Sequence, residues 1–178
     1  KKVLREVWRW FLEKNTSYQT FGGYAGTGKT TMIAFLRKAL DDKYPNLKVA
    51  FCSYTGKATR VLEETLKKHY ALFEQDVTGT IHSLIYEPVK DKQNRIKYWE
   101  KSKDLEADLI ILDEASMVDA KIWADLRSYK IPILAVGDHG QLPPINGDFN
   151  LMQDPDLRLE KIHRQARGNK IIQLSEKV

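Results

Sequence analysis

Residues 23–30, with the sequence GYAGTGKT, have the types and spacing that bind phosphate groups. They match the pattern G-x-x-x-x-G-K-[ST] in full and lie between an apolar run and a helical pattern. Glycines are needed because backbone N–H groups must point at the phosphates, and a Cβ would obstruct their approach. We expect Lys29 to reach the β- and γ-phosphates of a nucleotide and the Thr30 hydroxyl to bind Mg²⁺. The alternative is a flexible glycine connector, which the Lys-Thr ending disfavours.

The predicted nucleotide-binding residues are Gly23, Ala25, Gly26, Thr27, Gly28, Lys29, Thr30 and Thr31. An acidic pair is the second candidate for chemistry, because Asp113 and Glu114 directly follow the apolar run 109–112. Ligands of open α/β sheets gather at the carboxyl ends of strands. We therefore predict that Asp113 holds Mg²⁺ and that Glu114 acts as a general base toward water. An acidic pair in this place is often a helix cap, but its combination with a phosphate loop favours catalysis.

Gln141 is the third candidate, within the sequence GDHGQLPP at residues 137–144. This sequence follows another apolar run at residues 131–136. A neutral amide at such a strand end can hydrogen-bond the attacking water or the γ-phosphate, and so report the state of the nucleotide. The alternative is an ordinary turn, for which glycine and proline are typical.

The elements that position these residues alternate between helical and strand patterns. Apolar residues recur at helical spacing in four segments, residues 3–11, 30–40, 57–69 and 120–127. Short apolar runs typical of buried strands occur at Thr20 and Phe21 and at residues 49–53, 109–112 and 131–136. Runs that do not alternate are expected in parallel strands covered on both faces. The sequence therefore predicts an α/β fold with a parallel sheet flanked by helices.

Residues 86–103 interrupt this alternation. A polar, turn-like centre, KDKQN, is flanked by Tyr86 and Val89 on one side and by Ile96, Tyr98 and Trp99 on the other. This arrangement predicts a small β-hairpin that stands off the sheet.

Composition limits the class of protein. The chain has 178 residues, of which 42% are hydrophobic and 30% charged, so it is about one globular domain and neither disordered nor a disulfide scaffold. The single cysteine, Cys52, lies in an apolar run and is expected to be a small buried hydrophobe. The apolar runs fall short of the roughly 20 residues that span a membrane, and no signal-peptide pattern opens the chain, so we expect a cytoplasmic, intracellular protein. The net charge of +5 permits a polyanionic partner without proving one.

Several motifs in order resemble those of the superfamily 1 DNA helicases, specifically the RecD-like and Dda-like branch, over nearly the whole chain. Residues 23–30 resemble motif I, residues 113–117 (DEASM) motif II, and residues 137–144 motif III. Residues 53–58 are similar to motif Ia, residues 80–84 (TIHSL) to the next DNA-side motif, and residues 162–165 (IHRQ) to motif IV. The DEASM and GDxxQLPP strings are far more specific than a phosphate loop alone.

The resemblance implies that residues 1–178 are the first RecA-like motor domain of an ATP-dependent DNA helicase that moves 5′→3′, an AAA-type P-loop ATPase. A second RecA-like domain, absent from this sequence, would be needed for translocation and unwinding, so this chain alone would hydrolyse ATP weakly. The implied cofactors are ATP and Mg²⁺, and the implied partners are single-stranded DNA and duplex junctions, with no membrane and with protein partners unknown.

The resemblance also implies roles for individual residues. Catalysis would rest on Lys29, Glu114, Gln141 and Arg164, with Arg164 on the γ-phosphate. The DNA backbone would be contacted by Thr55, Lys57, Thr80 and His82. The alternatives are that Thr55 caps a helix, that His82 is buried, and that Arg164 is a surface arginine. The family usually has Ala-Pro before the motif Ia threonine, where this chain has Ser53 and Tyr54.

The hairpin predicted at residues 86–103 occupies the interval where RecD-like and Dda-like helicases carry a pin. Tyr98 or Trp99 would then lie near the point where duplex strands separate, unless both aromatic rings pack the hairpin onto the domain. Two other classes of protein remain open from the residues alone. One is another phosphate-loop enzyme, such as a small-molecule kinase, and the other is a nucleic-acid-binding module without catalysis.

Overall fold

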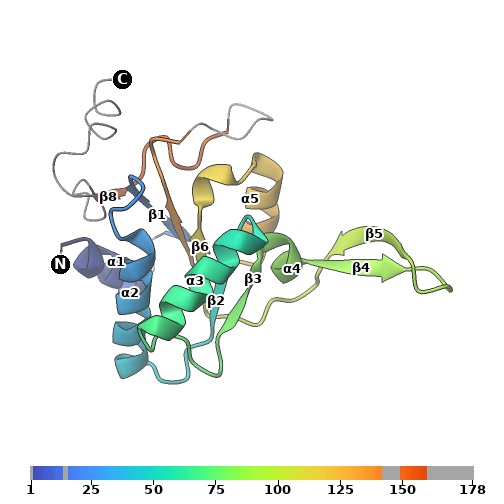
Figure 1. Ribbon diagram of the computed structural model, residues 1–178, viewed down its shortest axis with the longest axis horizontal. Coiled ribbons are helices and arrows are strands. Elements are labelled where there is room, and N and C mark those ends of the chain that lie inside the picture. Colours follow the sequence, from blue (N-terminus) through green and yellow to red (C-terminus); the bar gives the residue numbers. More distant parts are fainter. Residues whose placement is uncertain (1, 14–15, 142–148, 160–178) are drawn as a thin grey trace.

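A six-stranded parallel sheet forms the centre of the protein, whose computed structural model describes residues 2–13, 16–141 and 149–159 (Figure 1). The strand order is β3-β2-β6-β7-β1-β8. The strands are β1 (Tyr18–Gly23), β2 (Val49–Ser53), β3 (Val77–Thr80), β6 (Leu109–Asp113), β7 (Ile133–Gly137) and β8 (Leu157–Leu159). The helices are α1 (Lys2–Glu13), α2 (Lys29–Lys43), α3 (Gly56–Lys68), α4 (Ile81–Ile85) and α5 (Ala120–Arg127), with a 3₁₀ turn η1 (Ala115–Met117). The predicted α/β class is confirmed.

The central strands are buried on both faces, which explains their continuous apolar sequences. In β6, Ile111 faces the core beneath α1, α2 and α3, whereas its neighbours Ile110 and Leu112 face the core beneath α4 and α5. Each strand thus contributes alternate side chains to two cores. Cys52 is fully buried in β2, as predicted.

A buried ion pair fastens α2 to one side of the sheet. The Arg37 guanidinium lies 2.9 Å from the Asp76 carboxylate, and both side chains are fully buried. The same carboxylate accepts hydrogen bonds from the backbone N–H groups of Val49 and Phe73, at 3.2 and 3.1 Å. The Phe73 ring covers the guanidinium at 4.2 Å. Asp76 therefore links the helix after the phosphate loop to β2 and to the segment before β3.

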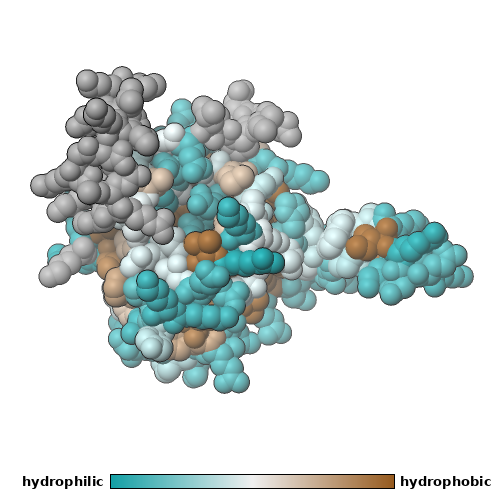
Figure 2. Space-filling view, viewed as in Figure 1, coloured by the Kyte–Doolittle hydropathy of each residue, from teal (hydrophilic) through white to brown (hydrophobic). Residues whose placement is uncertain are grey.

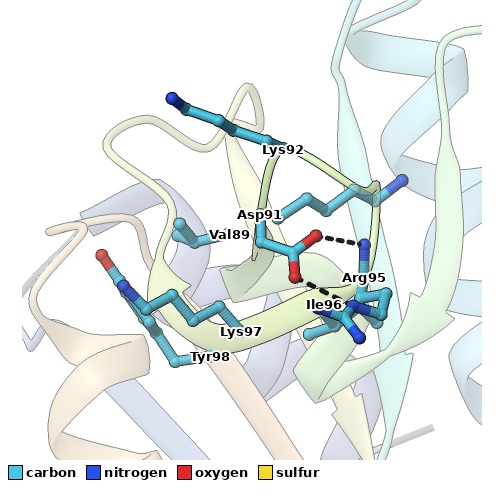
Figure 3. A pocket seen from close by; sticks show the side chains of 8 residues that line it. Val89, Asp91, Lys92, Arg95, Ile96, Lys97 and Tyr98 are labelled. Carbon is cyan, nitrogen blue, oxygen red and sulfur yellow. Dashed lines mark hydrogen bonds and ion pairs between the residues drawn. The ribbon is translucent and has the colours of Figure 1, made fainter.

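The predicted hairpin is present as β4 (Tyr86–Lys90) and β5 (Ile96–Lys101), which pair antiparallel with each other and project away from the sheet (Figure 1). Its tip is closed by Asp91, whose carboxylate accepts from the backbone N–H group of Gln93. The same carboxylate accepts from the backbone N–H group of Arg95 and pairs with the Arg95 guanidinium (Figure 3). Figure 2 shows the hairpin as a hydrophilic arm with one hydrophobic patch.

Four elements were not predicted from the sequence, namely β3, α4, η1 and β8. The four predicted helices agree with the structure to within three residues and the apolar runs to within two, and the strand predicted at 131–136 begins at Ile133. Within the described residues, no helix is long and apolar enough to cross a membrane.

Candidate nucleotide-binding site

The phosphate loop connects the carboxyl end of β1 to the first residue of α2. Gly26 and Gly28 have φ of 79° and 89°, in the left-handed region that side chains disfavour. The Tyr24 carbonyl accepts hydrogen bonds from the Thr27 N–H at 3.2 Å and the Thr27 hydroxyl at 2.8 Å, which closes the loop on itself. A Cβ on Gly23 would lie 2.7 Å from the Thr27 hydroxyl oxygen. The glycines therefore permit a compact loop with N–H groups turned inward.

Lys29 and Thr30 place two functional groups at the start of α2. The Lys29 ammonium donates to the carbonyl oxygens of Gly23 at 2.7 Å and Tyr24 at 3.3 Å. The Thr30 hydroxyl donates to Asp113 Oδ2 at 3.1 Å, although the two residues are 83 positions apart. This hydrogen bond brings the phosphate loop and the acidic pair to one point at the carboxyl edge of the sheet.

Asp113 is a buried carboxyl group with a strongly perturbed pKa. Burial, followed by the charge of the adjacent Glu114, raises the pKa of Asp113 to about 6. The pKa of the neighbouring Cys52 thiol is also raised, to about 12, because of burial and the charge of Asp113. A buried carboxyl group with a strongly raised pKa is typical of a functional site, such as one that receives a cation.

Glu114 and Gln141 lie on two adjacent loops that are bonded to each other. Glu114 adopts a left-handed conformation, with φ of 57°, and its N–H donates to Asp113 Oδ1 at 3.0 Å. The Ser116 hydroxyl donates to Gln141 Oε1 at 2.8 Å, which leaves the amide nitrogen as the donor toward a phosphate or water. The buried Asp138 carboxylate accepts from the Gly140 N–H at 2.9 Å and shapes the same loop. The acidic pair and the glutamine are therefore positioned together.

A cleft of about 560 Å³ opens above these groups. Its walls are formed by Ala25, Gly26, Gly28, Lys29, Thr30, Thr31, Thr55, Lys57, Ala58, Val61, Thr65, Asp113, Glu114, Met117, Asp138 and Gln141. Most of the predicted nucleotide-binding residues line it, together with the two residues predicted for magnesium. Thr27 is instead buried, and Gly23 contributes its carbonyl to Lys29.

Ser116 and Asp138 were not singled out from the sequence as functional residues. Both lie inside strings that the sequence did highlight, DEASM and GDHGQ. Only their position within these strings could have indicated a functional role, because a serine and an aspartate in such loops are also ordinary turn residues.

The residues predicted to contact DNA fall into two groups. Thr55 and Lys57 lie at the start of α3, and Thr80 and His82 lie at the start of α4. Thr55 and Lys57 line the cleft itself, and the Thr55 hydroxyl caps α3 by accepting from the Ala58 N–H at 3.2 Å. The helix-cap role considered for Thr55 is thus what the structure shows. Thr80 caps α4 in the same way, accepting from the Ser83 N–H at 3.1 Å.

His82 belongs to the second group, on α4, and its side chain is exposed rather than buried as the alternative held. The centroid of its ring lies 6.2 Å from that of Tyr54 and 5.6 Å from that of Tyr86. Tyr98 and Trp99 are about half exposed on β5, at 50% and 57%. Arg164, like the remainder of residues 160–178 and residues 142–148, lies outside the described residues.

The parallel sheet, the glycine loop before α2 and the acidic pair after β6 define a P-loop nucleotide-binding domain. The family described as AAA domain matches residues 5–178, and the chain belongs to that family.

The chain is similar to parts of two longer helicases. The chain is 32% identical over 162 residues to the ATP-dependent RecD2 DNA helicase of Deinococcus radiodurans, which covers 85% of this chain and 20% of that protein. It is 29% identical over 144 residues to the ATP-dependent DNA helicase dda of Enterobacteria phage T4, covering 78% of this chain and 31% of that protein. The chain therefore spans between a fifth and a third of the length of these relatives.

Solved structures share the fold. The crystal structure of Bacteroides Pif1 bound to ssDNA superimposes with a TM-score of 0.56 at 21% identity, covering 92% of this chain and 42% of that chain. A structure of Pif1 helicases at forked dsDNA gives a TM-score of 0.63 at 19% identity, covering 94% of this chain and 45% of that chain. Together with the relatives, these likenesses confirm the resemblance to the RecD-like branch of superfamily 1 and the RecA-like fold that it implied.

Proposed function

We propose that this chain is the first, ATP-binding motor domain of an ATP-dependent DNA helicase, which couples ATP hydrolysis to 5′→3′ movement along single-stranded DNA and to the opening of duplex junctions. The observation that carries this proposal is the Thr30–Asp113 hydrogen bond, which unites the phosphate loop and the acidic pair around one cleft. The RecD2 and dda proteins, named as ATP-dependent DNA helicases, support the choice of DNA as the polymer.

The donor set of the cleft fits magnesium. A threonine hydroxyl and a buried carboxylate, 3.1 Å apart at the end of the phosphate loop, are oxygen ligands of the kind that Mg²⁺ takes beside substrate phosphates. When bound, the ion would neutralise charge on the β- and γ-phosphates. Thr30 and Asp113 would hold it, and ionisation of Asp113 would then be favoured by the cation rather than opposed by burial.

Lys29 changes partners in the proposed reaction. Its ammonium now donates to two carbonyl oxygens of the phosphate loop, and a nucleotide would offer it phosphate oxygens instead. Hydrogen bonds between two charged groups are stronger than those to a neutral carbonyl, so this exchange favours nucleotide binding. The glycine N–H groups and the start of α2 supply further donors.

Glu114 and Gln141 would act on the attacking water. The proposed role of Glu114 is to accept a proton from that water as it attacks the γ-phosphate. The Gln141 amide, fixed through Ser116, would orient the water or register the γ-phosphate. Arg164 is proposed, from its motif, to stabilise charge on the phosphate during transfer.

DNA contacts are proposed for Thr55, Lys57, Thr80 and His82. Hydroxyl and basic donors suit phosphate contacts that do not read sequence. Thr55 and Lys57 also line the nucleotide cleft, so this pair is placed to respond to both ligands. Movement along DNA requires a second motor domain that closes over the nucleotide, which we propose the longer protein supplies.

Two paired experiments test this function. The first compares binding of a fluorescent ATP analogue by Lys29→Ala with that by Lys38→Ala, a control on the exposed side of the same helix. We expect the affinity to fall by about tenfold or more only in Lys29→Ala, since a charged hydrogen bond is lost.

The second experiment measures unwinding of duplexes with a 5′ or a 3′ tail by the full-length protein. Unwinding from the 3′ tail alone would overturn the proposed polarity, and equal nucleotide affinity of both variants would overturn the site.

A further inference from the structure

The root of the β4–β5 hairpin is fastened to α5 and the turn that follows it. The Tyr86 hydroxyl donates to Asp125 Oδ2 at 2.5 Å, and the Lys101 ammonium donates to the Ser128 hydroxyl at 2.7 Å. The Tyr129 hydroxyl donates to the Ser102 carbonyl at 2.7 Å and lies 3.2 Å from that of Ile85. We call Tyr86, Lys101, Asp125, Ser128 and Tyr129 the root clamp.

The contacts of the root clamp are more than incidental surface bonds. Burial and the Asp125 carboxylate raise the pKa of Tyr86 to about 12, and the protonated hydroxyl donates to that carboxylate. The Lys101 ammonium lies 5.3 Å from the centroid of the Tyr129 ring, which adds a cation–π contact. Both strands of the hairpin are thus held, one at its first residue and the other at its last.

Beyond its root, the hairpin has little support. Its two strands pair only with each other in the described structure, and all six residues of β5 are exposed. An isolated two-stranded hairpin is marginally stable in water, and its direction is set by whatever holds its base. The position of the tip relative to the domain therefore depends on the root clamp.

The helix on the other side of the clamp leads directly to the nucleotide site. Asp119 caps the start of α5 by accepting from the Ile122 N–H at 2.9 Å, and Trp123 packs in the core beneath the sheet. The preceding 3₁₀ turn η1 contains Ser116, which bonds Gln141, and follows Glu114 without a break. A short, packed path of backbone thus joins the acidic pair to the hairpin root.

We propose that the root clamp fixes the direction of the hairpin relative to the nucleotide site, and that Tyr86 and Tyr129 are positioning residues for duplex opening. The proposal rests on the proposed helicase function. Without the clamp the hairpin swings about its base, so ATP turnover on single-stranded DNA continues while fewer base pairs open for each ATP consumed.

The test removes only the two clamp hydroxyls, in the Tyr86→Phe/Tyr129→Phe variant, because both rings and their packing remain. Tyr70→Phe, at an exposed tyrosine after α3, is the matched control. Spin labels on Lys92→Cys at the hairpin tip and Lys68→Cys on α3 report the direction of the hairpin, and the buried Cys52 is shielded from the label. Base pairs opened per ATP and DNA-stimulated kcat are measured with the full-length protein carrying the same substitutions.

In the Tyr86→Phe/Tyr129→Phe variant we expect a broader distribution of label distances. Because two hydrogen-bond donors are lost, we expect the number of base pairs opened per ATP to fall about fivefold. We expect kcat to change by less than about twofold. Asp125→Asn, whose amide oxygen still accepts from Tyr86, should preserve more of the coupling than Asp125→Ala. An unchanged distance distribution, or a proportional fall in kcat and unwinding, would overturn the clamp. If the parent protein opens no duplex, the proposed function fails, and the label distances alone then decide the clamp.

Discussion

Stability and the proposed function favour opposite ionisation states of the Asp113 carboxyl group. The folded domain buries this carboxyl, while the proposed magnesium site needs it ionised. Its raised pKa, about 6, means that the folded protein holds the proton more tightly than the unfolded chain does. The contribution of Asp113 to the free energy of unfolding therefore falls as the pH rises from about 4 to about 6, and above that range its burial costs on the order of 3 kcal/mol.

Replacing Asp113 by Asn should relieve this cost. We predict that Asp113→Asn unfolds at higher urea concentration than the parent at pH 8, and that the difference shrinks at pH 5, where the parent carboxyl is protonated. The same variant should lose the stabilisation that Mg²⁺ and ATP give the parent. A difference in urea midpoint that did not vary with pH would contradict this account of Asp113.

Sequence patterns predicted the residues that line the cleft better than the residues that hold those side chains in place. Lys29, Thr30, Asp113 and Gln141 line one cleft, because a phosphate loop and the ends of parallel strands meet at one edge of a sheet. Ser116 was missed because its contact with Gln141 spans 25 positions and depends on how two loops pack. For Thr55 the sequence left open whether it binds DNA or caps a helix, and the structure shows that the cap is made.

At the scale of elements, the buried ion pair between α2 and the segment before β3 should be a strong determinant of stability. Replacing Asp76 with Asn removes the fully buried carboxylate from the Arg37 guanidinium, which keeps only the partly exposed Asp41 carboxylate, at 3.2 Å, as a charged partner. We predict a loss of about 3–5 kcal/mol in the free energy of unfolding, measured by urea denaturation. Glu106→Gln, which breaks the exposed Lys48–Glu106 pair, should cost less than about 1 kcal/mol. Equal effects of the two variants would show that Asp76 does not support α2 as described.

The hairpin tip should matter for strand separation and not for ATP turnover. Replacing residues 91–95 with an Asn-Gly turn shortens the tip while keeping the pairing of β4 with β5. Because Tyr98 and Trp99 stay on β5 but the tip no longer reaches as far, we predict reduced unwinding by the full-length protein with DNA-stimulated ATPase preserved. Loss of both activities together would refute a wedge role for the hairpin.

Two of the elements that were not predicted from the sequence, β3 and β8, are strands created by pairing. The segment Val77–Thr80 contains a glycine and has only four residues, and it becomes a strand because it pairs with β2, Gly79 beside Cys52. The three residues of β8 have no pattern of their own and pair with β1 from far along the sequence. By contrast, the hairpin at residues 86–103 was predicted because its polar turn and flanking aromatic residues are local features.

At the scale of the whole molecule, the domain has a cleft lined by the phosphate loop and the acidic pair. Its hairpin projects as an arm beside α4 (Figure 1). The chain matches 20% and 31% of the two helicases to which it is similar, and a motor whose two domains close on one nucleotide needs a longer protein than this domain. We therefore expect slow ATP hydrolysis by this domain alone and DNA-dependent hydrolysis by the longer protein.

The most direct measurement is ATP turnover by the full-length protein, with and without single-stranded DNA, beside its Glu114→Gln variant. The account predicts strong stimulation by DNA in the parent, and in the variant a loss of turnover of about a hundredfold or more with nucleotide binding retained, because only the proton acceptor is removed. Turnover that is indifferent to DNA, or a Glu114→Gln variant that still hydrolyses ATP at the parent rate, would contradict it.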